Sequence, residues 1–296
     1  MKNTKTMRRF IALQPLLLAA LFILTSCRHS REDIVPDTER QTGTVEFQVA
    51  NYEQFEYEDM TRAMTITDLA HLDMAVYDSA SYDLVTHIHK VPADAGYGKF
   101  STTLPYGSYY FVFLGYVGTK EAIVDDIEGI CFDDDFVAHT FYKLLQVNVS
   151  KSQTNTQSVI LTRCVAEFNL KLKGGIPSDM GKLTISSKGG SHHLNALTGR
   201  GKEVEPRSYT YNAAGYAGKD TLSVNFYSYL TDDEATMDFT ATAYNQSQSV
   251  IRSREFTNVP MKINQRTIYS GNFFDDDHNF QITVDNTEWE TEEFTY

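Results

Sequence analysis

The sequence predicts an all-β protein made of two β-sandwiches in tandem. Apolar and polar residues alternate along many short segments, which is the pattern of strands with one buried and one solvated face. Tyr and Phe occur 18 times each, and aromatic side chains favour strands. Few segments show helical periodicity, and only residues 120–130 could form a short helix. Many short strands separated by polar turns are typical of a sandwich.

The predicted strands follow one another along most of the chain. Val45, Phe47 and Val49 alternate with polar residues, and residues 109–117 are apolar on both faces, which predicts a central strand. The polar segment 150–158 predicts a hairpin or a crossing. Further strands are expected at residues 72–76, 145–149, 164–172, 183–186, 221–230, 237–244, 251–256 and 266–274.

The clearest alternation lies in residues 163–173, RCVAEFNLKLK. It predicts a strand of an antiparallel sheet with one apolar and one wet face. The residues expected to face the core are Cys164, Ala166, Phe168, Leu170 and Leu172. Those expected to face solvent are Glu167, Asn169, Lys171 and Lys173. Because about 230 residues of strand pattern exceed one small sandwich, we expect one sandwich at residues 45–162 and a second at 163–296.

The N-terminus has the three parts of a secretory signal peptide. A basic start is followed by an apolar run over residues 10–24 and by the small residues Thr25 and Ser26. The segment Leu-Thr-Ser-Cys resembles the lipobox of bacterial lipoproteins, which implies cleavage after residue 26 and acylation of the Cys27 thiol. The alternative is an uncleaved signal anchor. Residues 27–44 carry few apolar side chains and predict a flexible tether.

The net charge of the chain excludes some classes of partner. The chain carries 26 basic and 39 acidic residues, a net charge of −13. Residues 1–26 include four basic and no acidic side chains, so the mature chain has 22 basic against 39 acidic residues, or −17. Such a chain is a poor ligand for nucleic acid and is repelled by anionic lipid. Attachment to the outer membrane must therefore come from lipid on Cys27.

Residues with catalytic or metal-binding chemistry form no recognised motif, and we expect neither an enzyme nor a cofactor or metal site. The pair His192–His193 follows two glycines, and an exposed loop is the expected setting because zinc needs three or four convergent ligands. His87 and His89 lie on one side of a strand, either as an exposed face or as metal ligands. Residues 133–135 and 275–277 are acidic triplets expected in solvated loops.

Two cysteines remain once Cys27 is acylated. Cys131 and Cys164 either form a disulfide, which an exported protein permits, or are two buried thiols that behave as small apolar side chains. Cys164 lies in a predicted strand and faces its core.

Together with the lipobox, three segments resemble the fimbrillins and FimB-like fimbrial anchor lipoproteins of anaerobic Gram-negative bacteria. Residues 61–78, TRAMTITDLAHLDMAVYD, resemble the Thr-Arg-Ala segment that leads into an early strand. Residues 104–118 resemble the family's Leu-Pro-x-Gly-x-Tyr strand, and residues 261–274 its Asn-x-Arg-Thr-x-x-x-Gly strand. The strand that begins at residue 161 fits the start of the family's second domain.

The resemblance implies two tandem transthyretin-like, Greek-key β-sandwiches and a role in pilus anchoring or assembly with fimbrial subunits as partners. Shaft subunits of this family lose an N-terminal strand by cleavage after Arg or Lys, for which Arg40 and Arg62 are candidates here. Anchors keep their N-terminus and lipid. The acidic group at residues 31–33 resembles signals that place lipoproteins on the outer face of the outer membrane.

The last segment has the pattern of a donor strand. Phe280, Ile282 and Val284 alternate with polar residues, and Trp289 follows. A strand that enters a neighbouring subunit gains main-chain hydrogen bonds, while its alternate side chains fill pockets. The alternative is that this segment is the last strand of its own sandwich.

A different function, binding of polysaccharide by a surface lipoprotein, would use exposed aromatic platforms. The chain offers seven tyrosines for this role: Tyr106, Tyr109, Tyr110, Tyr209, Tyr211, Tyr227 and Tyr229. Core strands account for most of them, so the fimbrial interpretation is preferred.

Overall fold

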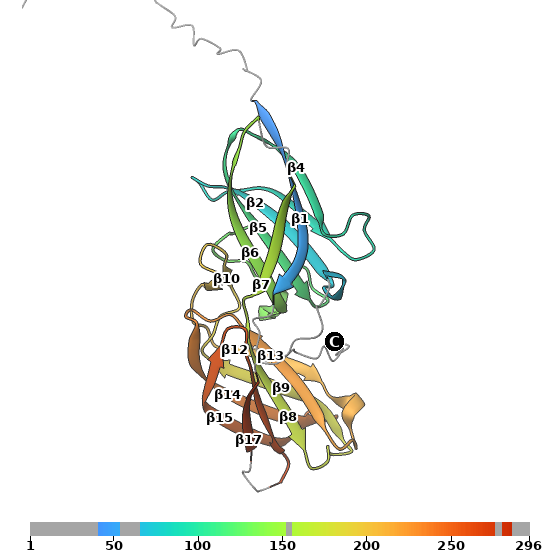
Figure 1. Ribbon diagram of the computed structural model, residues 1–296. Coiled ribbons are helices and arrows are strands. Elements are labelled where there is room, and N and C mark those ends of the chain that lie inside the picture. The colour runs from blue at the N-terminus through green and yellow to red at the C-terminus, as the bar shows by residue number, and fades with distance from the viewer. Residues whose placement is uncertain (1–40, 54–65, 152–155, 276–279, 286–296) are drawn as a thin grey trace, which may run out of the picture. The chain divides into compact units, whose positions relative to one another are not determined.

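The computed structural model describes residues 41–53, 66–151, 156–275 and 280–285 (Figure 1). The signal peptide, Cys27, Arg40, Arg62 and Trp289 therefore lie outside the described residues. Strands dominate the described chain, which confirms the all-β class. Its helices are three short 3-10 turns, and none of these described helices has the length and apolar character needed to span a bilayer.

The first part of the chain forms one seven-stranded sheet in the order β3-β2-β5-β6-β7-β1-β4. All neighbouring strands are antiparallel except β1 and β7, which run parallel and lie side by side in Figure 1. The strands are β1 (Thr42–Glu53), β2 (His71–Asp78), β3 (Leu84–Lys90), β4 (Lys99–Pro105), β5 (Gly107–Val117), β6 (His139–Val149) and β7 (Gln157–Arg163).

The inner face of this sheet closes over an aromatic core. Phe47 of β1 packs against Phe111 and Phe113 of β5, with ring centroids 4.9 and 5.0 Å apart. Phe100 of β4 contacts Phe113 from the same side. Strands β6 and β7 pair through only two residue pairs, beginning with Phe141 and Arg163. Strands β1 and β4 therefore pack across the core from β2 and β5, which gives a sandwich-like arrangement.

Two four-stranded sheets follow. Their orders are β12-β9-β14-β15 and β13-β8-β16-β17, and β8 and β16 are parallel. Phe168 of β8 and Phe239 of β14 stack at 4.1 Å, so the two sheets share one apolar core. The larger strands are β8 (Ala166–Lys173), β9 (Met180–Lys188), β12 (Arg207–Asn212), β13 (Leu222–Ser228), β14 (Glu234–Asn245), β15 (Val250–Lys262), β16 (Arg266–Asn272) and β17 (Phe280–Asp285).

A third apolar cluster covers the outer face of β2 and β5. Tyr77, Leu114 and Tyr116 pack there against the segment between β5 and β6 and against Leu194 of the short strand β10 (Leu194–Asn195), which pairs with β11 (Arg200–Gly201). This explains why β5 is apolar on both faces, as the sequence predicts. The strands up to β7, which ends at Arg163, form the seven-stranded sheet, and the strands from β8, which begins at Ala166, belong to other sheets. This change lies close to the predicted division. The described residues belong to one compact unit, so the division into two domains stays a prediction.

Two expectations are wrong in detail. Residues 120–130 form no helix, because Ala122, Val124 and Ile130 are buried under the sheet by an irregular chain whose Ile123 bridges to Cys131. On β8, the Lys171 and Lys173 side chains are exposed as expected, but two polar residues of that face are buried.

Those two residues, Glu167 and Asn169, are buried because neighbouring strands supply polar partners. Arg266 of β16 places Nε 3.0 Å from Oε1 of Glu167, and Asn169 donates from Nδ2 to Oγ of Ser223 on β13. A paired carboxylate and a bonded amide tolerate burial that unpaired groups would not.

Candidate functional site

The predicted donor segment forms β17, and β17 pairs antiparallel with β16 of the same chain. Phe280 lies opposite Gly271, and its ring meets that of Phe256 with centroids 5.1 Å apart. Ile282 and Val284 follow on the same strand, opposite Tyr269 and Thr267. The segment thus occupies the edge of its own sheet in this structure, and its exchange with another subunit stays a prediction.

Strand β1 lies between the candidate cleavage points at Arg40 and Arg62. It pairs with β4 on one side and with β7 on the other. Val45, Phe47 and Val49 are at most 2% exposed. The first strand is therefore an integral part of the sandwich core in the uncut chain.

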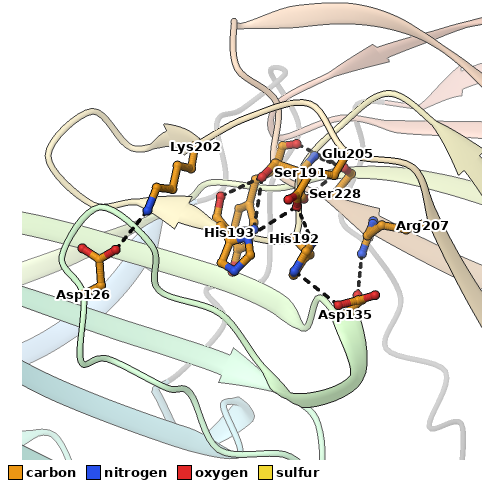
Figure 2. Close-up of polar contacts among 10 residues, drawn as sticks. Asp126, Asp135, Ser191, His192, His193, Lys202, Glu205, Arg207 and Ser228 are labelled. Atoms are coloured by element: carbon orange, nitrogen blue, oxygen red, sulfur yellow. Dashed lines mark hydrogen bonds and ion pairs between the residues drawn. The ribbon is translucent and has the colours of Figure 1, made fainter.

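The structure also brings together a group of ionisable side chains at the loop that joins β9 to β12 (Figure 2). His192 and His193 belong to this loop, and Glu205 closes it. The three residues offer imidazole and carboxylate atoms that all lie within 4.8 Å of one another. The expectation of an exposed loop is wrong for this pair, since only 14% of the His192 side chain and 27% of the His193 side chain are exposed.

Backbone hydrogen bonds fix both ends of the histidine pair. Ser191 exchanges backbone hydrogen bonds with Tyr229, and Leu194 exchanges them with Ile130. The Ser191 hydroxyl donates to the carbonyl of His193 and accepts from its amide. Because Ser191 and Leu194 are fully buried, the two histidines are held between two anchored residues.

Glu205 reaches the pair because the loop folds back on itself. Its backbone amide donates to the carbonyl of Gly190 at 2.8 Å. Gly190 has φ +72°, a left-handed conformation that favours glycine, and a Cβ at this position would collide with Oγ of Ser228. The two glycines before the histidines are therefore part of the geometry of the site.

Both histidines of the cluster contact the same carboxylate oxygen. Oε2 of Glu205 lies 2.7 Å from Nδ1 of His192 and 3.4 Å from Nδ1 of His193. On the other edge of its ring, Nε2 of His192 lies 3.3 Å from Oδ1 of Asp135. Burial is the main cause that lowers the pKa of His192, and the neighbouring His193 adds to it.

Charged residues around the cluster are engaged with other groups. Lys202 forms an ion pair with Asp126 at 3.0 Å, and Arg207 donates from Nη1 to the backbone carbonyl of Asp135 at 3.1 Å. Figure 2 shows Asp126 and Asp135, both from the segment between β5 and β6, facing the histidine loop. The site therefore combines residues that are far apart in sequence.

A second histidine group lies on the seven-stranded sheet. His87 and His89 contact the same oxygen, Oδ1 of Asp73, at 2.5 and 2.9 Å. The prediction that they share one side of a strand is confirmed. His87 is exposed, as expected for a solvent-facing strand, whereas His89 is half-buried. Asp73 is 1% exposed, so the two imidazoles supply polar partners to one oxygen of a buried carboxylate.

The remaining predicted groups are placed as follows. Residues 133–135 are exposed, as expected for a solvated loop, and residues 276–277 of the second triplet lie outside the described residues. Cys131 and Cys164 are free thiols, which confirms the unpaired alternative. Of the seven tyrosines proposed as a glycan platform, Tyr109 and Tyr229 are buried and the other five are half-buried.

Sequence comparison identifies a family but no characterised relative. Residues 37–295 match the model of a family of unknown function, DUF6562. No curated protein matches the chain.

Solved structures are similar to this chain at low sequence identity. A candidate polysaccharide-binding protein from Bacteroides thetaiotaomicron has a TM-score of 0.50 at 10% identity, with 84% of this chain and 99% of that chain covered. A candidate adhesin from Bacteroides ovatus has a TM-score of 0.48 at 12% identity, covering 79% and 88%. The fimbrial anchor protein Mfa2 from Porphyromonas gingivalis has a TM-score of 0.44 at 11% identity, covering 83% and 98%.

Proposed function

The chain belongs to the family of unknown function DUF6562, and we propose that this member is a non-catalytic, lipid-anchored cell-surface protein that acts in the anchoring or assembly of fimbriae. The ordered sequence motifs that resemble fimbrial anchor lipoproteins support the proposal, as does the all-β fold. The partners would be fimbrial subunits, and the outer membrane would hold the protein through the lipid on Cys27.

The observation that carries the proposal is the position of β17. This strand is the last in the order β13-β8-β16-β17, so among the described strands it has a neighbour on one side only. An edge strand presents main-chain donors and acceptors that a strand of another chain can pair with. Phe280, Ile282 and Val284 supply the alternation that β-strand addition uses for specificity.

Strand β1 defines how an anchor and a shaft subunit would differ. Cleavage after Arg62 would remove β1 and leave β4 and β7 without the strand that joins them. The vacated groove would have lost Phe47, whose burial contributes about 1.5–3 kcal/mol. A donor strand with alternating apolar residues would fill it. An anchor that retains β1 keeps this groove occupied and can offer only its other edges.

The lipid supplies the membrane attachment that the charge of the protein opposes. A mature chain of net charge −17 is repelled by anionic headgroups, so the acyl chains on Cys27 must hold it. We expect Cys27→Ser to move the protein from the envelope fraction to the soluble fraction. If the serine variant still sediments with the envelope in fully processed form, the lipid anchor is wrong.

Two further experiments test the assembly role. Mass spectrometry of the mature N-terminus is expected to find acylated Cys27, whereas a start after Arg40 or Arg62 would indicate a polymerising subunit. Deletion of residues 279–296 should release fimbriae or change their length and yield. A circular dichroism spectrum of the purified variant checks that it still folds. Unchanged fimbriae with a folded variant would contradict the proposed role.

The glycan alternative has less support in the structure. None of its seven tyrosines is exposed, so these side chains form no open aromatic platform. Calorimetric titration with a polysaccharide panel is expected to give no heat of binding.

A further inference from the structure

We propose that His192, His193 and Glu205 form a binding site for one divalent transition-metal ion, with zinc as the best fit. This site is independent of the fimbrial role proposed above. It stands on three atoms of the β9–β12 loop: Nδ1 of His192, Nδ1 of His193 and Oε2 of Glu205 (Figure 2).

The first observation is that all three atoms are buried and lack a hydrogen-bond partner in the described structure. Buried polar atoms are nearly always bonded, and an unbonded one calls for an explanation such as a bound ion. Here three such atoms converge, because Oε2 of Glu205 lies 2.7 and 3.4 Å from the two Nδ1 atoms. An imidazole nitrogen and a carboxylate oxygen at 2.7 Å, without hydrogen-bond alignment, repel each other unless a positive charge lies beside them.

The second observation is the chemistry of the donor set. Two imidazole nitrogens and one carboxylate oxygen suit zinc, whereas calcium takes six to eight oxygens. A tetrahedral ion with ligand bonds of about 2.0–2.1 Å places its ligand atoms roughly 3.3 Å apart. Oε2 of Glu205 lies 2.7 and 3.4 Å from the two imidazole nitrogens, near this separation.

The third observation is an outer carboxylate behind one ligand. Oδ1 of Asp135 lies 3.3 Å from Nε2 of His192, the ring nitrogen on the side away from Glu205. Metal-binding histidines usually donate their second ring N–H to such a group, which leaves the other nitrogen free for the ion. Asp135 comes from the segment between β5 and β6, so the ion would link that segment to the loop after β9.

The ligands are also held in place before an ion arrives. Ser191 and Leu194 anchor the histidines on both sides, and the amide of Glu205 is bonded to the carbonyl of Gly190. Binding would therefore order few additional side chains. Three protein ligands leave a coordination position for water or for a side chain of a partner, as in other zinc sites with three protein ligands.

Calorimetric titration of zinc chloride into the full chain, purified in detergent and stripped with a chelator, tests the site. We expect one zinc ion per chain to bind at this site, with its heat absent from the double variant His192→Ala/His193→Ala. Glu205→Gln, which keeps the shape of the side chain, should weaken binding at least tenfold. Glu203→Gln removes the same charge from an exposed neighbour and should bind as the unaltered chain does.

Two further readouts separate the site from unrelated effects. Asp135→Asn should weaken zinc binding by about 10–100-fold, the usual effect of an outer-shell group. Cobalt(II) should give the intense visible bands of a tetrahedral complex, and these should be lost in Glu205→Gln. Melting curves without metal check that each variant folds. Absence of zinc binding, or equal binding by the unaltered chain, Glu205→Gln and the double histidine variant, would overturn the proposal.

Discussion

Arg163 donates from Nε to Nε2 of His139 at 2.7 Å, and both side chains are buried. The contact joins the start of β6 to the end of β7, and the His139 ring also stacks on Tyr227 of β13. A guanidinium that donates to this nitrogen requires a neutral imidazole. Burial, followed by the charges of Arg163 and Arg266, holds the pKa of His139 well below its usual value.

This pair predicts a loss of stability in mild acid. In the unfolded chain His139 binds a proton near its ordinary pKa of 6.5, whereas the folded protein does not. Because the unfolded state binds more protons, the free energy of unfolding falls as the pH drops below 6.5, by up to about 1.4 kcal/mol per pH unit. We expect His139→Gln to lose this contribution, since glutamine does not titrate.

Urea unfolding at about pH 7 and about pH 5 measures the effect. Other groups titrate equally in both proteins, so the difference between them isolates His139. If the two proteins lose the same free energy of unfolding between these pH values, His139 does not control this part of the acid response.

The buried ion pair between Glu167 and Arg266 predicts a non-additive response. Arg266→Met leaves the fully buried Glu167 carboxylate without this partner and should lower the free energy of unfolding by about 3–5 kcal/mol. The double variant Glu167→Leu/Arg266→Met should recover most of this loss, because apolar side chains of similar volume replace both charges.

Denaturant titration of both single variants and of the double variant completes the cycle. Lys171→Met provides a control on the exposed part of β8 and should change stability by less than about 0.5 kcal/mol. Simple additivity of the two single substitutions would show that the pair is not coupled.

The histidine loop depends on the backbone of Gly190. We expect Gly190→Ala to lower the free energy of unfolding by about 2–3 kcal/mol, since it places a Cβ against Ser228 at φ +72°. Gly215→Ala is the matched control, because a Cβ at Gly215 meets no atom within 4 Å. Thermal unfolding compares the two, and equal melting temperatures would contradict this account of the loop.

The two thiols should differ in reactivity. Cys164 is buried, and burial raises the pKa of its thiol well above the usual value, whereas Cys131 is half-buried and its pKa rises less. We expect Cys131 to react slowly with a thiol reagent in the folded protein, and Cys164 to react only after unfolding. Alkylation without reductant followed by mass spectrometry identifies each site. Detection of a disulfide between them would contradict the free-thiol assignment.

The pattern of apolar and polar residues predicted the strands that bury at least one regular face. Alternation at Val45, Phe47 and Val49 and the apolar segment that became β5 correspond to observed strands, because each buries at least one regular face. Strands β4 and β12 were not expected, since KFSTTLP and RSYTYN contain mostly polar residues. Their place is determined by pairing with β1 and β9, which local sequence does not report.

The polar partners were harder to predict than the apolar core. The alternation predicts that Glu167 faces solvent. Its burial depends on Arg266, which lies beside it because β16 pairs in parallel with β8. The proposed zinc ligands are equally hard to predict from local sequence. The histidine pair is visible in the sequence, but Glu205 and Asp135 carry no local signal of convergence. A carboxylate shortly after a Gly-Gly-x-His-His turn is the one hint that could have been used.

The parallel pairings have a consequence for the order in which the protein can fold. Phe47 pairs with Gln157, and Glu167 pairs with Arg266. Strands β1 and β8 therefore each pair with a strand that is synthesised roughly a hundred residues later. Closing such long loops costs entropy before the pairing is gained, which places folding on the slow side, about milliseconds to seconds. While the chain emerges from synthesis, β1 can pair with β4 and β8 with β13, but the edges that later pair with β7 and β16 stay open. A holding chaperone or rapid passage across the membrane would protect these open edges during that interval.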